Sequence, residues 1–269
     1  MKTHSVWFHP TKVETIGMFK RFGLFWMLTL ALTVATHAVA ADSQSKTAAA
    51  PDLDFRIDVD VYAEENKAPI ATLQTIFTAG LYIELDEQTG RTTVFDPGKS
   101  QITILDSNRK SLVHLDMTSI DSQLSLGLSK MTQEQSVRFL SEGGPLLEEG
   151  NLFSIGNKFW RYKFRPTTPS NPAIAISYGD FANWSVKLNA VYPPRKPPFR
   201  LQLNQLLIDQ RQLPTELRRI TYADGRTEEI VARLILKESL NDNDRARIAS
   251  VYTSMKEYKI ATDAEFFKK

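Results

Sequence analysis

The feature that most constrains the fold is a period-two alternation of apolar and polar residues that begins at Leu53. It continues through 55–61 and, after a polar turn, through 73–85. Such spacing predicts strands with one buried side and one solvent-facing side. Gly80 interrupts the second strand and predicts a bulge or bend there. The apolar residues expected to share one face are Phe55, Ile57, Val59, Val61, Leu73, Phe77, Leu81 and Ile83.

Short strands joined by turns follow this pair. The segments 91–95, 101–105 and 110–116 alternate in the same way and are separated by Asp96-Pro97-Gly98 and Asp106-Ser107-Asn108. Proline, glycine, asparagine and aspartate favour tight turns for known backbone reasons. The first half of the chain is therefore expected to be an antiparallel meander.

Two helices are expected next. The first covers 118–129, with Ile120, Leu124 and Leu128 on one stripe. The second begins at Thr132, which forms a capping-box pattern with Gln135. Further strands are expected at 152–155, 158–165, 173–178, 184–192, 214–222 and 226–236, with helices starting near Phe199 and near Asn241 or Asp242. Because the helices come in blocks, the fold class is α+β, and 53–269 is expected to form one domain with a C-terminal helical tail.

The N-terminus resembles a cleavable secretory signal peptide. Lys20 and Arg21 precede the uncharged apolar run 22–35, and Ala38-Val39-Ala40 supplies small residues for cleavage near Ala40. The apolar core is shorter than the ~20 residues that span a bilayer. We expect 1–40 to be the signal peptide and 41–52 a flexible linker, which predicts a periplasmic or extracellular protein. Met18 is an alternative start.

Charge and composition exclude several classes of function. The chain carries 33 basic and 31 acidic residues. Loss of 1–40 removes four basic residues and one acidic residue, so 29 basic and 30 acidic residues remain. This balance gives no electrostatic case for binding to nucleic acid or to an anionic membrane. Any contact with a membrane is expected to be transient. With no cysteine and with His114 as the one histidine after the leader, neither a transition-metal site nor a cofactor is expected.

No catalytic motif lies in its required context. Ser107 and Lys110 match S-x-x-K, but they fall in a predicted hairpin turn and lack the partner motifs. Asp58 and Asp60 share a strand face, where they could bind Ca²⁺ or simply face solvent. His114 has no nearby nucleophile and is expected to be a surface or cross-strand residue. We therefore expect no enzymatic activity and no catalytic residue.

The strand over 159–165 has two contrasting faces. Trp160, Tyr162 and Phe164 alternate with Arg161, Lys163 and Arg165. The basic side could bind an acidic ligand. An ordinary strand with one core side and one surface side would show the same pattern.

The order of these elements resembles the LolA-like superfamily of outer-membrane lipoprotein carriers. The likeness rests on the long strands at 55–61 and 73–85, the Phe95-Asp96-Pro97 turn, the helices at 118–141 and the later hairpins. It implies a curved, mostly antiparallel half-barrel with helices packed on its concave face. It also implies a lipid or a lipoprotein acyl chain as ligand. The proline segment 193–198 and the tail after Leu240 depart from that family.

Two functions follow as hypotheses. In the first, the protein carries a hydrophobic ligand in an apolar groove. The eight apolar residues of the first two strands would form the floor, and the helix bearing Ile120, Leu124 and Leu128 would be the lid. In the second, the protein is a structural or interaction module of the cell envelope with a closed core. An open apolar cavity of several hundred Å³ would distinguish the first from the second.

Overall fold

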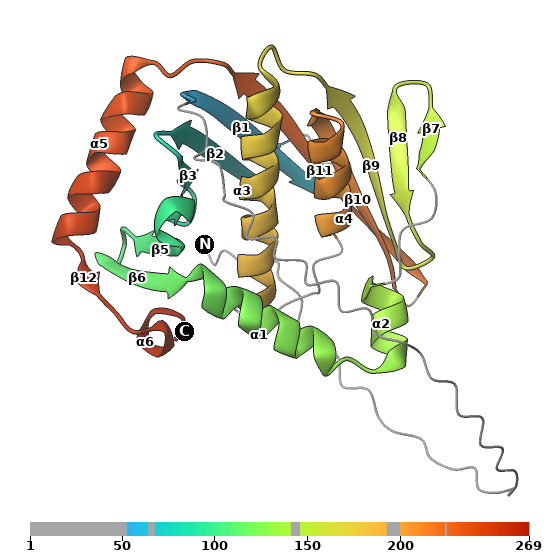
Figure 1. The fold of residues 1–269 in the computed structure, drawn as a ribbon, viewed down its shortest axis with the longest axis horizontal. Helices are drawn as coiled ribbons and strands as arrows, with labels where there is room; N and C mark the ends of the chain where they lie inside the picture. Colours follow the sequence, from blue (N-terminus) through green and yellow to red (C-terminus); the bar gives the residue numbers. More distant parts are fainter. Residues whose placement is uncertain (1–52, 64–67, 141–145, 193–199, 224, 269) are drawn as a thin grey trace, which may run out of the picture. The chain divides into compact units, whose positions relative to one another are not determined.

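The computed structural model describes residues 53–63, 68–140, 146–192, 200–223 and 225–268. The predicted signal peptide, the predicted linker and the proline segment 193–198 lie outside these ranges. Within them the chain has an α+β fold built on one open, curved sheet of twelve strands in the order β12-β6-β5-β4-β3-β2-β1-β11-β10-β9-β8-β7 (Figure 1). All neighbouring strands are antiparallel except β12 and β6, which are parallel.

The strands form a meander in the first half of the chain and a second set of hairpins after it. Their bounds are β1 Phe55–Ala63, β2 Ala71–Thr78, β3 Leu81–Asp86, β4 Arg91–Asp96, β5 Gln101–Asp106, β6 Ser111–Asp116, β7 Leu147–Glu149, β8 Leu152–Gly156, β9 Trp160–Thr167, β10 Leu213–Ala223, β11 Arg226–Lys237 and β12 Lys259–Ile260. The helices are α1 Met117–Ser129, α2 Gln133–Leu140, α3 Pro172–Val191, α4 Arg200–Asp209, α5 Asp242–Glu257 and α6 Asp263–Phe266, with a short 3-10 turn at Pro97–Lys99.

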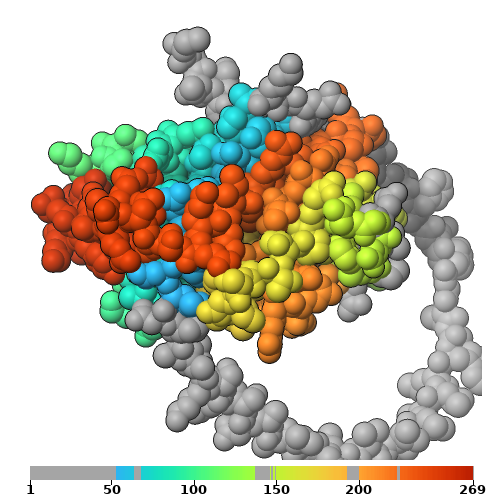
Figure 2. Space-filling view, turned by 90° about the horizontal axis from the view of Figure 1, so that it is seen from above, coloured from blue at the N-terminus to red at the C-terminus, as the bar shows by residue number. Residues whose placement is uncertain are grey.

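Helices pack on both faces of the sheet. On one face, α3 covers β1 to β6 and α4 covers β8 to β10, and each helix contributes to a hydrophobic cluster there. On the other face, α5 packs over β2 to β6. Figure 2 shows the C-terminal elements (red) at one end of the sheet and β8 and β9 (yellow-green) at the other. No helix among the described residues is long and apolar enough to cross a membrane.

The single strand predicted over 73–85 is wrong, because these residues form the β2–β3 hairpin. Ala79 and Gly80 both have positive φ, 46° and 74°, as a two-residue type I′ turn requires. The turn places Phe77 opposite Tyr82. Glycine at the second position adopts this backbone without strain, which explains why the chain reverses there rather than bending.

The strands predicted at 173–178 and 184–192 are also wrong, since both segments belong to helix α3. Asn171 caps the helix by accepting a hydrogen bond from the Ala173 N–H at 3.0 Å, and Pro172 occupies its first position. The helix is buried between the sheet and neighbouring helices, so apolar residues lie on several of its sides. The sequence of α3 therefore lacks the 3.6-residue period of a helix that is buried on one side only.

Other local signals are confirmed. The Thr132 hydroxyl accepts from the Gln135 N–H at 3.1 Å, and the Gln135 side chain accepts from the Thr132 N–H at 2.9 Å. Asn241 and Asp244 form the same reciprocal cap at the start of α5. The hairpin predicted around Gly225 is the β10–β11 pair.

Candidate functional site

The predicted floor lies on the face of the sheet that α3 covers. Pairing of β1 with β2 places Phe55 opposite Phe77 and Val59 opposite Leu73, so these residues share one side. The rings of Phe55 and Phe77 stack at 4.1 Å with 7° between their planes. Both side chains are 1% exposed, and Ile57 is equally buried. Toward the end of the strand, Val59, Val61 and Leu73 are half-buried.

Leu81 and Ile83 do not lie on this floor, and the expectation that they do is wrong. Across this two-residue hairpin, odd-numbered residues of β2 pair with even-numbered residues of β3. Odd-numbered residues therefore lie on one face of the sheet in β2 and on the other face in β3. Ile83 therefore pairs with Ile76 on the opposite face, in the cluster that α5 covers. Leu81 pairs with Thr78 on that same side.

The cover over the floor is α3, which the sequence did not predict as a helix. Phe181 meets Phe77, Phe95 and Tyr82 edge-on, with ring centroids 5.7, 5.4 and 6.3 Å away respectively. Edge-to-face contacts at these distances add stability beyond the area that they bury. The floor is consequently the core of the domain in this structure.

The predicted lid, α1, lies against β6 and α3 (Figure 1). Ile120 is fully buried in the large core cluster, whereas Leu124 and Leu128 are half-buried. An ion pair of 2.9 Å between Asp121 and Lys187 connects α1 to α3. Helix α1 therefore packs against α3 and stabilises its position.

A small cavity remains between the sheet and the C-terminal half of α3. It has a volume of about 160 Å³. Its walls include Glu84, Asp86 and Arg91 from the sheet and Ser185 and Asn189 from α3. Burial, with a smaller contribution from Asp86, raises the pKa of the Glu84 carboxyl to about 7. This polar cavity is not the apolar groove that the carrier hypothesis required.

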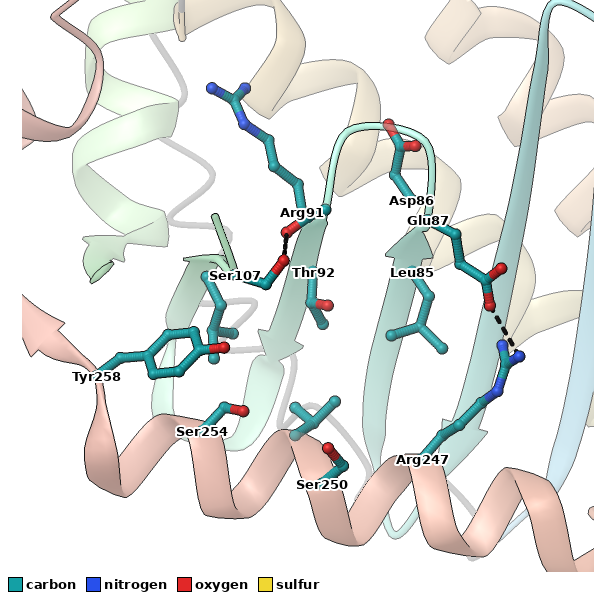
Figure 3. A pocket seen from close by; sticks show the side chains of 13 residues that line it. Leu85, Asp86, Glu87, Arg91, Thr92, Ser107, Arg247, Ser250, Ser254 and Tyr258 are labelled. Carbon is teal, nitrogen blue, oxygen red and sulfur yellow. Dashed lines mark hydrogen bonds and ion pairs between the residues drawn. The ribbon is translucent and has the colours of Figure 1, made fainter. Parts of the chain in front are cut away.

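A larger pocket of about 380 Å³ lies on the opposite face, between α5 and the turn that joins β3 to β4 (Figure 3). Apolar side chains of Leu85, Leu105 and Val251 contribute to its lining. Polar groups surround them: Thr92, Ser107, Ser250, Ser254 and Tyr258. At one end, Arg247 pairs with Glu87 at 2.8 Å. Apart from Ser107 of the S-x-x-K match, no sequence motif marked this pocket, because its residues come from segments distant along the chain.

The residues singled out for chemistry have structural partners. The Ser107 hydroxyl, in the β5–β6 turn, donates to the Gly90 carbonyl of the β3–β4 turn at 2.9 Å. His114 Nδ1 lies 2.9 Å from the Thr103 hydroxyl on the neighbouring strand, which confirms a cross-strand histidine. Asp58 accepts from Arg56 at 3.0 Å and Asp60 from Thr72 at 3.0 Å. In the described part of the chain, no group of three or more His, Cys, Asp or Glu residues is placed to hold a metal ion.

Comparisons with known proteins give structural likenesses but no match in sequence. No family model matches the chain, and no curated protein matches it. A crystal structure of a LolA superfamily protein from Nitrosomonas europaea aligns with 72% of this chain and 90% of that chain, at 7% sequence identity and a TM-score of 0.30. The fold class stated above rests on the topology of the sheet itself.

Proposed function

We propose that this chain is an exported, non-enzymatic protein of the cell envelope that acts through its surface, with a closed core in place of a ligand groove. The observation that supports this is the Phe55–Phe77 stack beneath Phe181, in which both floor rings are 1% exposed. Ligand pockets occupy about 300–1,000 Å³. The cavity of about 160 Å³ beside α3 is smaller than that range. The pocket of about 380 Å³ is within the range, but it lies on the opposite face of the sheet, away from the floor, and polar side chains surround its apolar lining.

Two further observations support the proposal. The ordered leader, with Lys20 and Arg21 before an apolar run and small residues before Ala41, is typical of export. The one S-x-x-K serine in the described part of the chain, Ser107, donates its hydroxyl to a backbone carbonyl in a tight turn. N-terminal sequencing of the secreted protein should read from about Ala41. Recovery of the exported protein with residue 30 intact would contradict cleavage.

Binding of a hydrophobic probe tests the closed core. The purified protein should bind neither a long-chain fatty acid nor an apolar fluorescent dye at a saturable site. The Phe77→Asp variant should fail to fold, because a charge would enter a packed aromatic cluster without a partner. Saturable fatty-acid binding, together with a Phe77→Asp variant that stays folded, would overturn the proposal.

The second candidate is the carrier, and the Glu84 cavity favours it. A polar cavity that contains a titratable carboxyl lies at the junction of α3 and the sheet. Displacement of α3 there would open the floor. Burial of an acyl chain of ~14 CH₂ groups would supply on the order of 10 kcal/mol before ordering costs, at ~0.8 kcal/mol per group.

Filling this cavity separates the two candidates. Ser185 contributes to the cavity, so Ser185→Phe should reduce acyl-chain binding if the protein is a carrier. The exposed Ser122 on α1 provides the matched control, Ser122→Phe. If neither the wild-type protein nor either variant binds an acyl chain, the closed-core function stands and the carrier is excluded.

A further inference from the structure

Strands β9, β10 and β11 present one side to the core and the other to solvent. Trp160, Tyr162, Phe164 and Leu217 pack against α4 in one hydrophobic cluster. The residues that alternate with them point away from α4. Within the described residues, the outward side chains of these three strands belong to none of the three hydrophobic clusters. No hydrophobic cluster therefore covers this side of the three strands, which we call the uncovered face. Two apolar residues on it, Ile220 and Val231, are themselves buried at 8% and 6% exposure.

Cationic side chains collect on this uncovered face. Six of them are Arg161, Lys163, Arg165, Arg218, Arg233 and Lys237. Two carboxylates, those of Glu216 and Glu229, lie on the same side of these three strands. We call the six residues the basic face. Asp58 and Asp60 on β1 border it, and both already accept hydrogen bonds from neighbouring side chains.

The strand register places like charges next to one another. Lys163 lies directly opposite Arg218 on the neighbouring strand. Like charges in directly opposed positions on one sheet face destabilise the pair, because their Cβ atoms are roughly 5 Å apart. Arg218 already has two carboxylate partners, whereas Lys163 has no ion pair among the described residues. An external anion that reaches Lys163 would therefore reduce the repulsion between the two cations.

The acidic residues do not neutralise the basic face. Arg165, Arg218 and Arg233 all approach the carboxylate of Glu216, at 3.8, 2.8 and 3.8 Å. Arg218 also pairs with Glu229 at 3.0 Å. Among the described residues, no ion pair includes Arg161, Lys163 or Lys237. The near balance of 33 basic and 31 acidic residues in the whole chain therefore conceals a local excess of positive charge.

The shape of the basic face indicates the kind of anion. Its cations extend along β9 at every second residue and across three neighbouring strands, so they form a two-dimensional array. Neither of the two cavities described above includes any of these residues. An acidic peptide would contact a line of cations, usually in a groove. A two-dimensional array matches the two-dimensional arrangement of phosphates at a surface better than a line of cations does.

We propose that the basic face binds the anionic phosphate headgroups of a lipid bilayer surface. This inference rests on the proposed function, since it names the surface through which an exported protein with a closed core would act. Contact is electrostatic and reversible, because each cation near an anionic bilayer contributes only modestly and salt screens it.

Vesicle binding by the full mature chain tests the inference. The probe is vesicles of phosphatidylglycerol mixed with phosphatidylcholine, compared with vesicles of phosphatidylcholine alone. The wild-type protein should co-sediment with the anionic vesicles only, and added salt should release it. The triple variant Arg161→Gln, Lys163→Gln, Lys237→Gln should bind on the order of a hundredfold more weakly, at about fivefold per removed cation.

A matched variant controls for net charge. Lys130→Gln, Lys256→Gln and Lys268→Gln remove the same charge from exposed positions outside the three strands. This control should bind anionic vesicles within about threefold of the wild type. Thermal unfolding should show that both triple variants are folded.

Four outcomes would overturn the inference. They are equal binding to both vesicle types, no binding to either type, a triple variant that binds like the wild type, and a control that loses as much as the triple variant. If the wild type binds neither vesicle type, an acidic protein becomes the occupant to test. Failure of the closed-core function is distinguishable, because it would appear as fatty-acid uptake by the wild type and the triple variant alike.

Discussion

The guanidinium of Arg56 on β1 contacts the carboxylate of Asp244 on α5 at 2.6 Å, and the Asp244 side chain is 1% exposed. Asp244 is also the residue that closes the cap of α5 with Asn241. One carboxylate therefore connects the helix to a strand that lies 188 residues earlier in the chain. It couples the position of α5 to the centre of the sheet.

Asp244→Ala should destabilise the protein by about 2–4 kcal/mol, because it leaves the largely buried Arg56 with Asp58 as its remaining carboxylate partner and also removes half of the reciprocal cap of α5. Chemical denaturation measures the change. Asp242→Ala is the control, since Asp242 lies in the same helical turn but is exposed, and it should change stability by less than about 1 kcal/mol. Equal effects of the two substitutions would show that the buried pair is not important.

Phe77→Ala should cost about 3–5 kcal/mol, as expected for the loss of a fully buried aromatic side chain. The ring contacts Phe55, Tyr82 and Phe181. Ile235→Ala, at a side chain that is 51% exposed, should change the free energy of unfolding by no more than about 0.5 kcal/mol. A loss below about 1 kcal/mol for Phe77→Ala would mean that the cluster under α3 is loosely packed, as a ligand groove would be.

Gly179→Ala should destabilise by about 1–3 kcal/mol through overpacking. A Cβ at this position would collide with the Ile208 side chain, so α3 and α4 could not approach as closely. Shortening the neighbour in Gly179→Ala/Ile208→Ala should recover part of the loss relative to the sum of the single substitutions. Strict additivity in this double-mutant cycle would contradict direct contact.

Glu84 should make stability fall as pH rises. Burial raises the pKa of its carboxyl from 4.5 to about 7 in the folded protein. The folded state therefore binds more protons than the unfolded state between these two values. The free energy of unfolding decreases across that window, by at most about 3 kcal/mol from this group, and is independent of Glu84 above it.

Urea denaturation at about pH 5 and about pH 8 measures this dependence. In Glu84→Gln, the free energy of unfolding should fall less between these two pH values than it does in the wild type. The variant should therefore be more stable than the wild type at the higher pH. Asp60→Asn, at a half-exposed strand position outside the cavity, is the control. An unchanged pH profile in Glu84→Gln would show that the carboxyl is solvated.

The sequence alone determined the elements whose signals are local. Alternation over 55–61 predicted β1, and the turn residues around Gly225 predicted the β10–β11 hairpin. The capping pair at Thr132 predicted where α2 begins, and α5 begins at Asp242, within the expected range of Asn241 or Asp242. The signals for these features depend on residues a few positions apart, so they can be recognised without knowledge of the tertiary contacts.

Only the tertiary structure decided which of these elements meet. Residues 172–191 alternate locally like strands, yet burial between the sheet and neighbouring helices stabilises the helix α3. The reversal at Ala79 and Gly80 moved Leu81 and Ile83 to the far face. Strand register then placed Lys163 beside Arg218, so charges that balance over the whole chain are segregated in space. Each of these outcomes depends on contacts between segments distant in sequence, which local propensity does not encode.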